Sequence, residues 1–206
     1  MSLSRLVNRP NVPGVSRDDR RYRAALIPDV IDGHREGEVL RTVGYLHVAV
    51  HEDDDDYHLQ LSPSKTDGND SLIVEVPSET QAPTPALATR YAAVRTFVRH
   101  LFGEQPPGLA ARYAAALAAR YTAVRTFIAY VRNLLGEEPR DVAAVLPDPV
   151  CVAVVGQLFY DDTYVGLENR GKQGQTTGTL WELHPIVSIA SSEECDSGAG
   201  PPVTGH

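Results

Sequence analysis

Hydrophobic and polar residues alternate along three segments of the chain, residues 42–51, 57–61 and 71–76. In the first segment Leu46 and Val48 fall on one face while polar and small residues fall on the other. A period of two residues is typical of β-strands. Because clusters of turn-forming residues separate the segments, the pattern predicts a meander of three strands.

The pattern then changes to a helical period. Apolar residues are spaced alternately by four and three within residues 87–101 and 109–135, which predicts two amphipathic helices. Gly103 and the prolines that follow it end the first helix. The short connection predicts an antiparallel helical hairpin over residues 85–136.

The two predicted helices are copies of each other. ALATRYAAVRTFV, which begins at Ala86, recurs as ALAARYTAVRTFI, which begins at Ala116. A segment of about thirty residues has therefore been duplicated in tandem. We favour a tolerated insertion at a permissive connection, since extra length at exposed loops costs little stability. A two-helix platform selected for a function is the alternative.

The chain returns to strand character after the helices. Residues 149–157 are almost wholly apolar and β-branched, and a long polar loop joins them to a second segment, residues 181–189. Residues 1–40 show no sustained period and predict an irregular N-terminal arm, with a short helix or strand within it as the alternative. The barrel domain is expected over residues 41–190, and the polar, Gly- and Pro-rich residues 191–206 predict a disordered tail.

The order of three strands, helix and two strands is that of the OB-fold, a partly open five-stranded barrel. A β-sandwich would not place its only helices between its third and fourth strands. The sequence therefore predicts a mainly β, α+β protein with an OB-type barrel and a helical insertion.

Four blocks of the sequence resemble recurrent blocks of an uncharacterised group of bacterial OB-like proteins. These blocks are DDDYHLQLS, SLIVEVP, VVGQLFYD and WELHPIVSI. The resemblance extends from Thr42 to Ile189. Within this range the duplicated helix departs from the pattern of the group. It implies the barrel fold and no activity.

Composition changes this picture little. The chain has 206 residues, of which 42% are hydrophobic and 22% charged, as in an ordinary soluble protein with one domain. Its formal net charge of -8 disfavours contact with phosphate backbones unless basic residues gather on one face.

The two cysteines and the N-terminal sequence bear on location. Cys151 lies in an apolar run and Cys195 in the polar tail, so we expect them not to pair. The N-terminal sequence has no continuous apolar segment of the secretory kind, and no run is long enough to span a membrane. A cytoplasmic location is expected, without membrane association.

The binding face of OB barrels is usually the surface of the second and third strands with the loops beside it. Here the loop between the last two strands offers aromatic and basic groups that can stack on bases and contact phosphates. The predicted ligand-binding residues are Tyr160, Tyr164, Asn169, Arg170, Lys172, His58 and Gln60. The predicted partner is a single-stranded nucleic acid or a protein.

Acidic and histidine residues provide a second lead. Residues 53–56 are four consecutive aspartates, which favour a solvated acidic turn and alternatively a hard divalent cation. The histidines on strands favour exposed side chains and alternatively a zinc or acid–base site, if they converge. The candidate metal ligands are Asp53, Asp55, His58 and His184.

No motif for a nucleophile, a phosphate-binding loop or a zinc protease is present. We therefore expect a non-catalytic binding module with no resident cofactor other than this candidate divalent cation. A metal-assisted hydrolase, similar to a nuclease, is the first alternative. A structural protein that self-associates through the helix pair is the second, and the sequence leaves the oligomeric state open.

Overall fold

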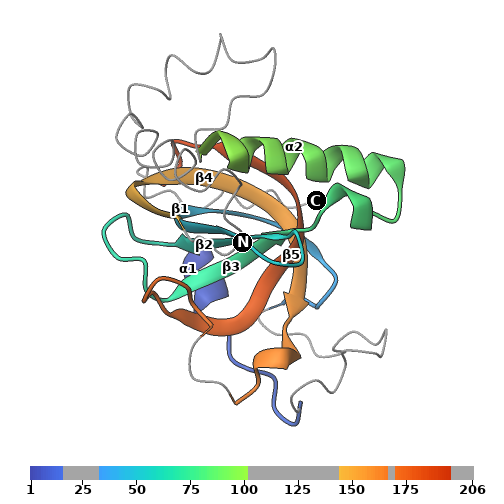
Figure 1. The fold of residues 1–206 in the computed structure, drawn as a ribbon. Coiled ribbons are helices and arrows are strands. Elements are labelled where there is room, and N and C mark those ends of the chain that lie inside the picture. Colours follow the sequence, from blue (N-terminus) through green and yellow to red (C-terminus); the bar gives the residue numbers. More distant parts are fainter. Residues whose placement is uncertain (16–32, 102–143, 167–169, 196–206) are drawn as a thin grey trace.

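A closed five-stranded barrel forms the body of the protein (Figure 1). The computed structural model describes residues 1–15, 33–101, 144–166 and 170–195. The strands are β1 (Val39–His51), β2 (Tyr57–Ser62), β3 (Ser71–Val76), β4 (Ala144–Tyr160) and β5 (Thr177–Ser191). They pair in the order β1-β2-β3-β5-β4, antiparallel except for the parallel pair β3 and β5. With a helix between β3 and β4, this confirms the predicted α+β, OB-like barrel.

Alternate residues of each strand fill the barrel interior. Leu59 and Leu61 of β2 and Val74 of β3 are fully buried there, as the alternation predicts. Trp181 of β5 lies in the same core with no exposed surface. The opposite face of β2 is also buried, including His58, so protein covers the outside of the barrel here as well.

Strands β1, β4 and β5 are longer than predicted. β1 and β4 continue their pairing as far as Val39, which lies opposite Gln157. The side chain of Val39 is exposed. Alternation of hydrophobic and polar residues gives no signal at this end of the ladder, because the apolar Val39 faces outward while the polar Thr42 is buried.

Prolines lie inside β4 and β5 where the register of pairing shifts. In the β1–β4 ladder the shift falls opposite residues 146–149, a segment that holds two prolines. In the β4–β5 ladder Pro185 falls between the paired residues Leu183 and Ile186, where the register shifts. A proline has no N–H to donate to a ladder, so a bulge accommodates it without a lost hydrogen bond.

The N-terminal residues contribute to the core. Helix α1 (Leu3–Val7) packs against β1, β3 and β5, and its residues Leu3, Leu6 and Val7 are buried. The N-terminal arm is therefore not irregular throughout. A five-residue helix is too short to show a helical period in the sequence, which explains why the pattern missed it.

Helix α2 (Pro85–Leu101) follows the one-turn 3-10 helix η1 (Glu79–Gln81) and packs against β5 and β3. In Figure 1 it is the long coil that lies across one end of the barrel. Its buried apolar residues are those of the predicted stripe: Tyr91, Val94, Val98 and Leu101. The predicted second helix, residues 109–135, lies outside the described residues, as does most of the predicted tail, residues 196–206. None of the described helices is long and apolar enough to cross a membrane.

Cys151 and Cys195 form a disulfide, with Cα atoms 5.9 Å apart. The expectation that they do not pair is wrong, because pairing depends on strand register rather than on the composition around each cysteine. The ladder places Val152 opposite Ser191, and the chain after Ser191 returns to Cys151. Disulfides are typical of oxidising compartments, so the argument from unpaired cysteines for a cytoplasmic location no longer holds.

The repeat predicts that one copy can be removed. The residues through which α2 packs, Tyr91, Val94 and Arg95, recur in the second copy as Tyr121, Val124 and Arg125. Deletion of residues 86–115 should therefore leave a folded barrel, since Pro85 would then precede an equivalent helix. We expect the midpoint of thermal unfolding, followed by circular dichroism, to change by no more than roughly 4 °C, equivalent to ~1 kcal/mol.

A substitution provides the control for this deletion. Arg125→Ala should be costly in the shortened chain, where Arg125 replaces Arg95, and nearly neutral in the full chain. A shortened chain without a cooperative unfolding transition would contradict the prediction and show that both copies are needed.

Candidate functional site

The acidic turn between β1 and β2 is anchored to helix α2. Arg95, whose side chain is almost fully buried, donates to the carbonyl and to the carboxylate of Asp55 and pairs with Glu79 through its Nε, 2.8 Å away. Its guanidinium also lies over the ring of Tyr57. Although burial alone would raise it, hydrogen bonds from Ser78 and His51 and the charge of Arg95 lower the pKa of Asp55 to about 2. Asp55 therefore holds the helix to the turn.

The other aspartates of this turn are divided between surface and interior. Asp53 is exposed. Asp56 is buried and accepts hydrogen bonds from the backbone of Ser78 and the side chain of Gln81. Burial, with the neighbouring charge of Asp54, raises the pKa of Asp56 to about 6. Among the described residues neither Asp53 nor Asp55 belongs to a group spaced to hold a metal.

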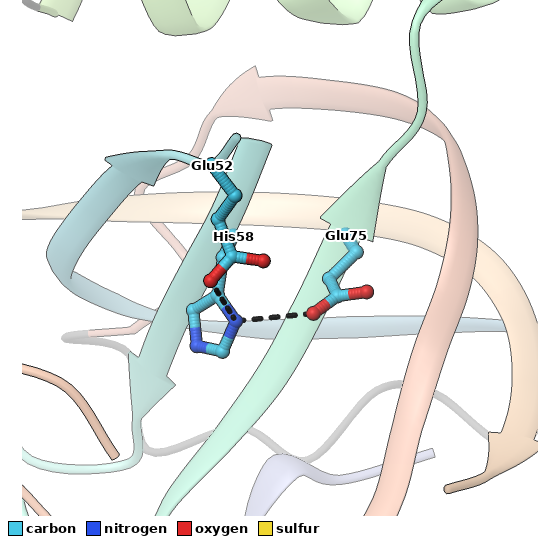
Figure 2. A group of neighbouring side chains, drawn as sticks. All are labelled: Glu52, His58 and Glu75. Atoms are coloured by element: carbon cyan, nitrogen blue, oxygen red, sulfur yellow. Dashed lines mark hydrogen bonds and ion pairs between the residues drawn. The ribbon is translucent and has the colours of Figure 1, made fainter. Parts of the chain in front are cut away.

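Histidine and glutamate side chains converge instead on the outer face of β2, β3 and β5. His58 and Glu75 are cross-strand partners, and the imidazole Nδ1 lies 3.0 Å from Glu75 Oε1. Glu52, the first residue after β1, places its Oε1 3.8 Å from the same nitrogen. Figure 2 shows both carboxylates facing this edge of the His58 ring. Convergence of this kind was the condition on which the predicted histidine site depended.

Strand β5 completes the group from the other side of Glu75. His184 Nδ1 lies 2.8 Å from Glu75 Oε2 and 3.5 Å from Glu182 Oε1. The parallel pairing of β3 with β5 places these residues beside Glu75. We call the five side chains the His–Glu cluster: Glu52, His58, Glu75, Glu182 and His184.

The loop between β4 and β5, which contains the 3-10 helix η2 (Asp162–Tyr164), is tied to this face of the sheet. The backbone N–H of Lys172 donates to Gln60 Oε1, and its ammonium lies 2.7 Å from Glu52 Oε1. Arg170 is buried and pairs with Glu182, 2.5 Å away, and with Asp161, 3.3 Å away. Each basic residue of the loop therefore meets a carboxylate at the cluster.

The remaining predicted ligand-binding residues have structural places. Tyr160 is fully buried, packs edge-on against Trp181 and accepts a hydrogen bond from the backbone of Val12. Tyr164 is half-buried beneath the guanidinium of Arg170. Asn169 lies outside the described residues. Of the predicted set, His58, Gln60, Arg170 and Lys172 are brought together, and Tyr160 belongs to the core.

Electrostatic coupling across the cluster favours ionised Glu75 and protonated His184 in the absence of a ligand. Although burial alone would raise it, hydrogen bonds from His184 and His58 hold the pKa of Glu75 well below its usual range. Burial alone would lower the pKa of His184, but hydrogen bonds to Glu182 and Glu75 raise it well above 6.5. Burial, together with the charge of Glu75, raises the pKa of Glu182.

Two overlapping groups of side chains in the cluster are spaced to hold a metal ion. One consists of Glu52, His58 and Glu75 and the other of Glu75, Glu182 and His184, and the ligand atoms within each group lie within 4.8 Å of one another. Both groups combine carboxylate oxygens with an imidazole nitrogen, the ligand set of Zn²⁺ and related first-row ions. Glu75 is common to both.

Sequence reasoning missed Glu52 and Glu75. Glu75 interrupts the apolar run SLIVEV, and a charged residue within a buried strand is a signal in itself. With the OB strand order, β3 and β5 become neighbours, which places Glu75 near the side that Glu182 and His184 share. Glu52 gave no such signal, because it stands in an acidic turn.

No family model, curated protein or solved structure matches the chain. Only the geometry of the cluster therefore bears on its chemistry.

The pKa of His184 can be measured directly. In chelator-treated protein we expect the His184 imidazole to titrate above pH 6.5 in an NMR titration, because Glu75 and Glu182 stabilise its protonated form. Glu75→Gln removes one of these charges and should lower that pKa. His100→Ala removes the signal of a histidine on helix α2, so that this signal is not mistaken for that of His184. If the pKa of His184 is unchanged in Glu75→Gln, the contact between His184 and Glu75 is contradicted.

Proposed function

We propose that the protein is a non-catalytic, OB-like binding module that holds a divalent cation at the His–Glu cluster. The observation that carries the proposal is the position of Glu75, a largely buried carboxylate with an imidazole nitrogen within 3.0 Å of each of its oxygens. Outer carboxylates from Glu52 and Glu182 complete the two groups of ligands.

The charge around the cluster supports a cation as the ligand. The carboxylates of Glu52, Glu75, Glu182 and Asp161 outnumber the ammonium of Lys172 and the guanidinium of Arg170. When ionised, the carboxylates leave an excess of two negative charges for the two imidazoles to neutralise. One divalent cation supplies the same charge without any proton on either ring.

His58 supports the same proposal. Its side chain is 5% exposed, and its Nδ1 faces two carboxylates. Within the described part of the chain its buried Nε2 has no hydrogen-bond partner. The polar contacts of the ring are therefore concentrated on the side where a cation would lie.

The same contacts favour a cation over a polyanion. Lys172 and Arg170, the basic residues expected to contact phosphates, are paired with Glu52 and Glu182. A single-stranded nucleic acid would have to displace these pairs and approach an acidic surface. A nucleic acid is thus the less supported ligand of the binding module. A protein partner and the resemblance to the uncharacterised bacterial OB-like group stay predictions.

Calorimetry tests the proposal. Titration of Zn²⁺ or Mn²⁺ into the chelator-treated full chain should give saturable binding, and a cation at about 100 times its Kd should stabilise the fold by ~2.7 kcal/mol. Glu75→Gln should abolish both effects, because it removes the carboxylate that the two groups share.

Matched control variants show whether metal binding depends on the His–Glu cluster or on other carboxylates and histidines. Glu193→Gln removes an exposed carboxylate and His100→Ala removes a histidine on α2, so both should bind as the unaltered chain does. Absence of saturable binding by either metal, or equal binding by Glu75→Gln, would refute the proposal.

A metal-assisted hydrolase is the second candidate. The side chain of His184 is 31% exposed, so water and a substrate can reach this edge of the cluster while Glu182 beside it stays buried. A cation held there by Glu75, Glu182 and His184 would lower the pKa of a bound water and so supply a nucleophile at neutral pH.

Incubation of plasmid and single-stranded DNA with the protein and Mg²⁺, Mn²⁺, Ca²⁺ or Zn²⁺ tests this candidate. A non-catalytic module leaves both substrates intact. Cleavage by the unaltered chain that is lost in Glu75→Gln would replace the binding module with the hydrolase.

A further inference from the structure

We propose that the His–Glu cluster binds two divalent cations, bridged by the carboxylate of Glu75. This inference rests on the proposed function, cation binding at the same cluster, and adds the number of ions and the ligands of each. The first site consists of Glu52, His58 and Glu75, and the second of Glu75, Glu182 and His184.

The two oxygens of Glu75 face different imidazoles. Oε1 lies 3.0 Å from His58 Nδ1, and Oε2 lies 2.8 Å from His184 Nδ1. A carboxylate that served one ion would turn both oxygens, or one alone, toward that ion. Here each oxygen has its own nitrogen partner, so Glu75 has the orientation of a bridging ligand.

Ligand separations agree with a metal of tetrahedral geometry at each site. Bonds of about 2.05 Å place neighbouring ligand atoms about 3.3 Å apart. In the first site His58 Nδ1 lies 3.0 Å from Glu75 and 3.8 Å from Glu52. In the second the distances from His184 Nδ1 are 2.8 Å to Glu75 and 3.5 Å to Glu182. In each site one distance is shorter and the other longer than this ligand spacing, so small side-chain rotations would bring the ligand atoms to it.

Two ions sharing one carboxylate lie about 3.5–4 Å apart in known two-metal sites. Two divalent cations bring four positive charges, twice the excess of carboxylates over basic groups at the cluster. The second ion therefore requires Lys172 to leave Glu52, after which Glu52, Glu75, Glu182 and Asp161 balance all but one of the positive charges. The ligand set is therefore three glutamates and two histidines, with one imidazole for each ion.

The two sites differ in how the loop between β4 and β5 contacts them. Lys172 Nζ lies 2.7 Å from Glu52 Oε1, the same oxygen that faces His58. Arg170 contacts Glu182 through Oε2, which leaves Oε1 toward His184. Lys172 therefore competes with the first-site cation, while Arg170 does not occupy the ligand oxygen of the second site. We expect the second site to fill first.

Metal stoichiometry tests the inference. The chelator-treated full chain is loaded with Mn²⁺, freed of excess metal and analysed for metal per chain by elemental analysis and by calorimetry. We expect two ions in the unaltered chain, one in Glu52→Gln, one in Glu182→Gln and none in Glu75→Gln. Electron paramagnetic resonance should show a coupled Mn²⁺ pair in the unaltered chain and isolated Mn²⁺ in the single-site variants.

Further variants keep the test decisive. Glu182 is buried and pairs with Arg170, so circular dichroism must first show that Glu182→Gln keeps the native fold before its metal content is interpreted. His184→Gln provides a second way to remove the same site. Lys172→Met should tighten the weaker site by roughly two- to fivefold, the effect of removing a partly exposed ion pair. Lys65→Met removes a lysine paired with Asp148 and should change nothing.

The outcomes distinguish the two proposals. Two ions with the expected losses support the bridged pair. One ion per chain, or two ions without magnetic coupling, overturns the bridged pair while leaving cation binding in place. No bound ion overturns both.

Discussion

The parallel pairing of β3 with β5 closes the barrel and determines which side chains meet on its outer face. Without this pairing Glu75 would stand at one open edge of a sheet, and the groups on β5 would stand at the opposite edge with three strands between them. With it, Glu182 and His184 lie beside Glu75, and His58 lies across from it on β2. Closure, which removes the exposed edges of the sheet, therefore also assembles the cluster.

Burial of so many ionisable groups requires that they neutralise one another, because an unpaired charge in a protein interior costs several kcal/mol. The loop between β4 and β5 contributes two of the balancing charges, on Arg170 and Lys172. On the opposite side, the pairing of Asp55 with Arg95 fixes the turn that carries Glu52. The helix and the loop thus hold the cluster from two directions, and its geometry is a property of the whole barrel.

The sequence predicted the fold better than the site. Alternation identified the three strands of the meander, and the helical stripe identified the buried residues of α2, because one-sided burial produces a period that a single sequence reveals. The meeting of His58 with Glu75, and of Cys151 with Cys195, depends on register between segments far apart in the chain. Such pairing has no local signal, and the same limit explains why basic residues on a loop suggested an anionic ligand while their carboxylate partners went unseen.

The disulfide determines how the barrel would respond to force. Any pull transmitted along the chain beyond Cys195 reaches β4 through a covalent bond at Cys151 before it reaches the end of β5. The end of the β4–β5 ladder, where the N–H of Ser192 donates to the carbonyl of Cys151, is thereby spared from being opened one bond at a time. Separation of this end from the barrel must therefore also disrupt the pairing of β4 with β1. Under force, the C-terminal end of the described chain therefore transmits load to β4 rather than to β5.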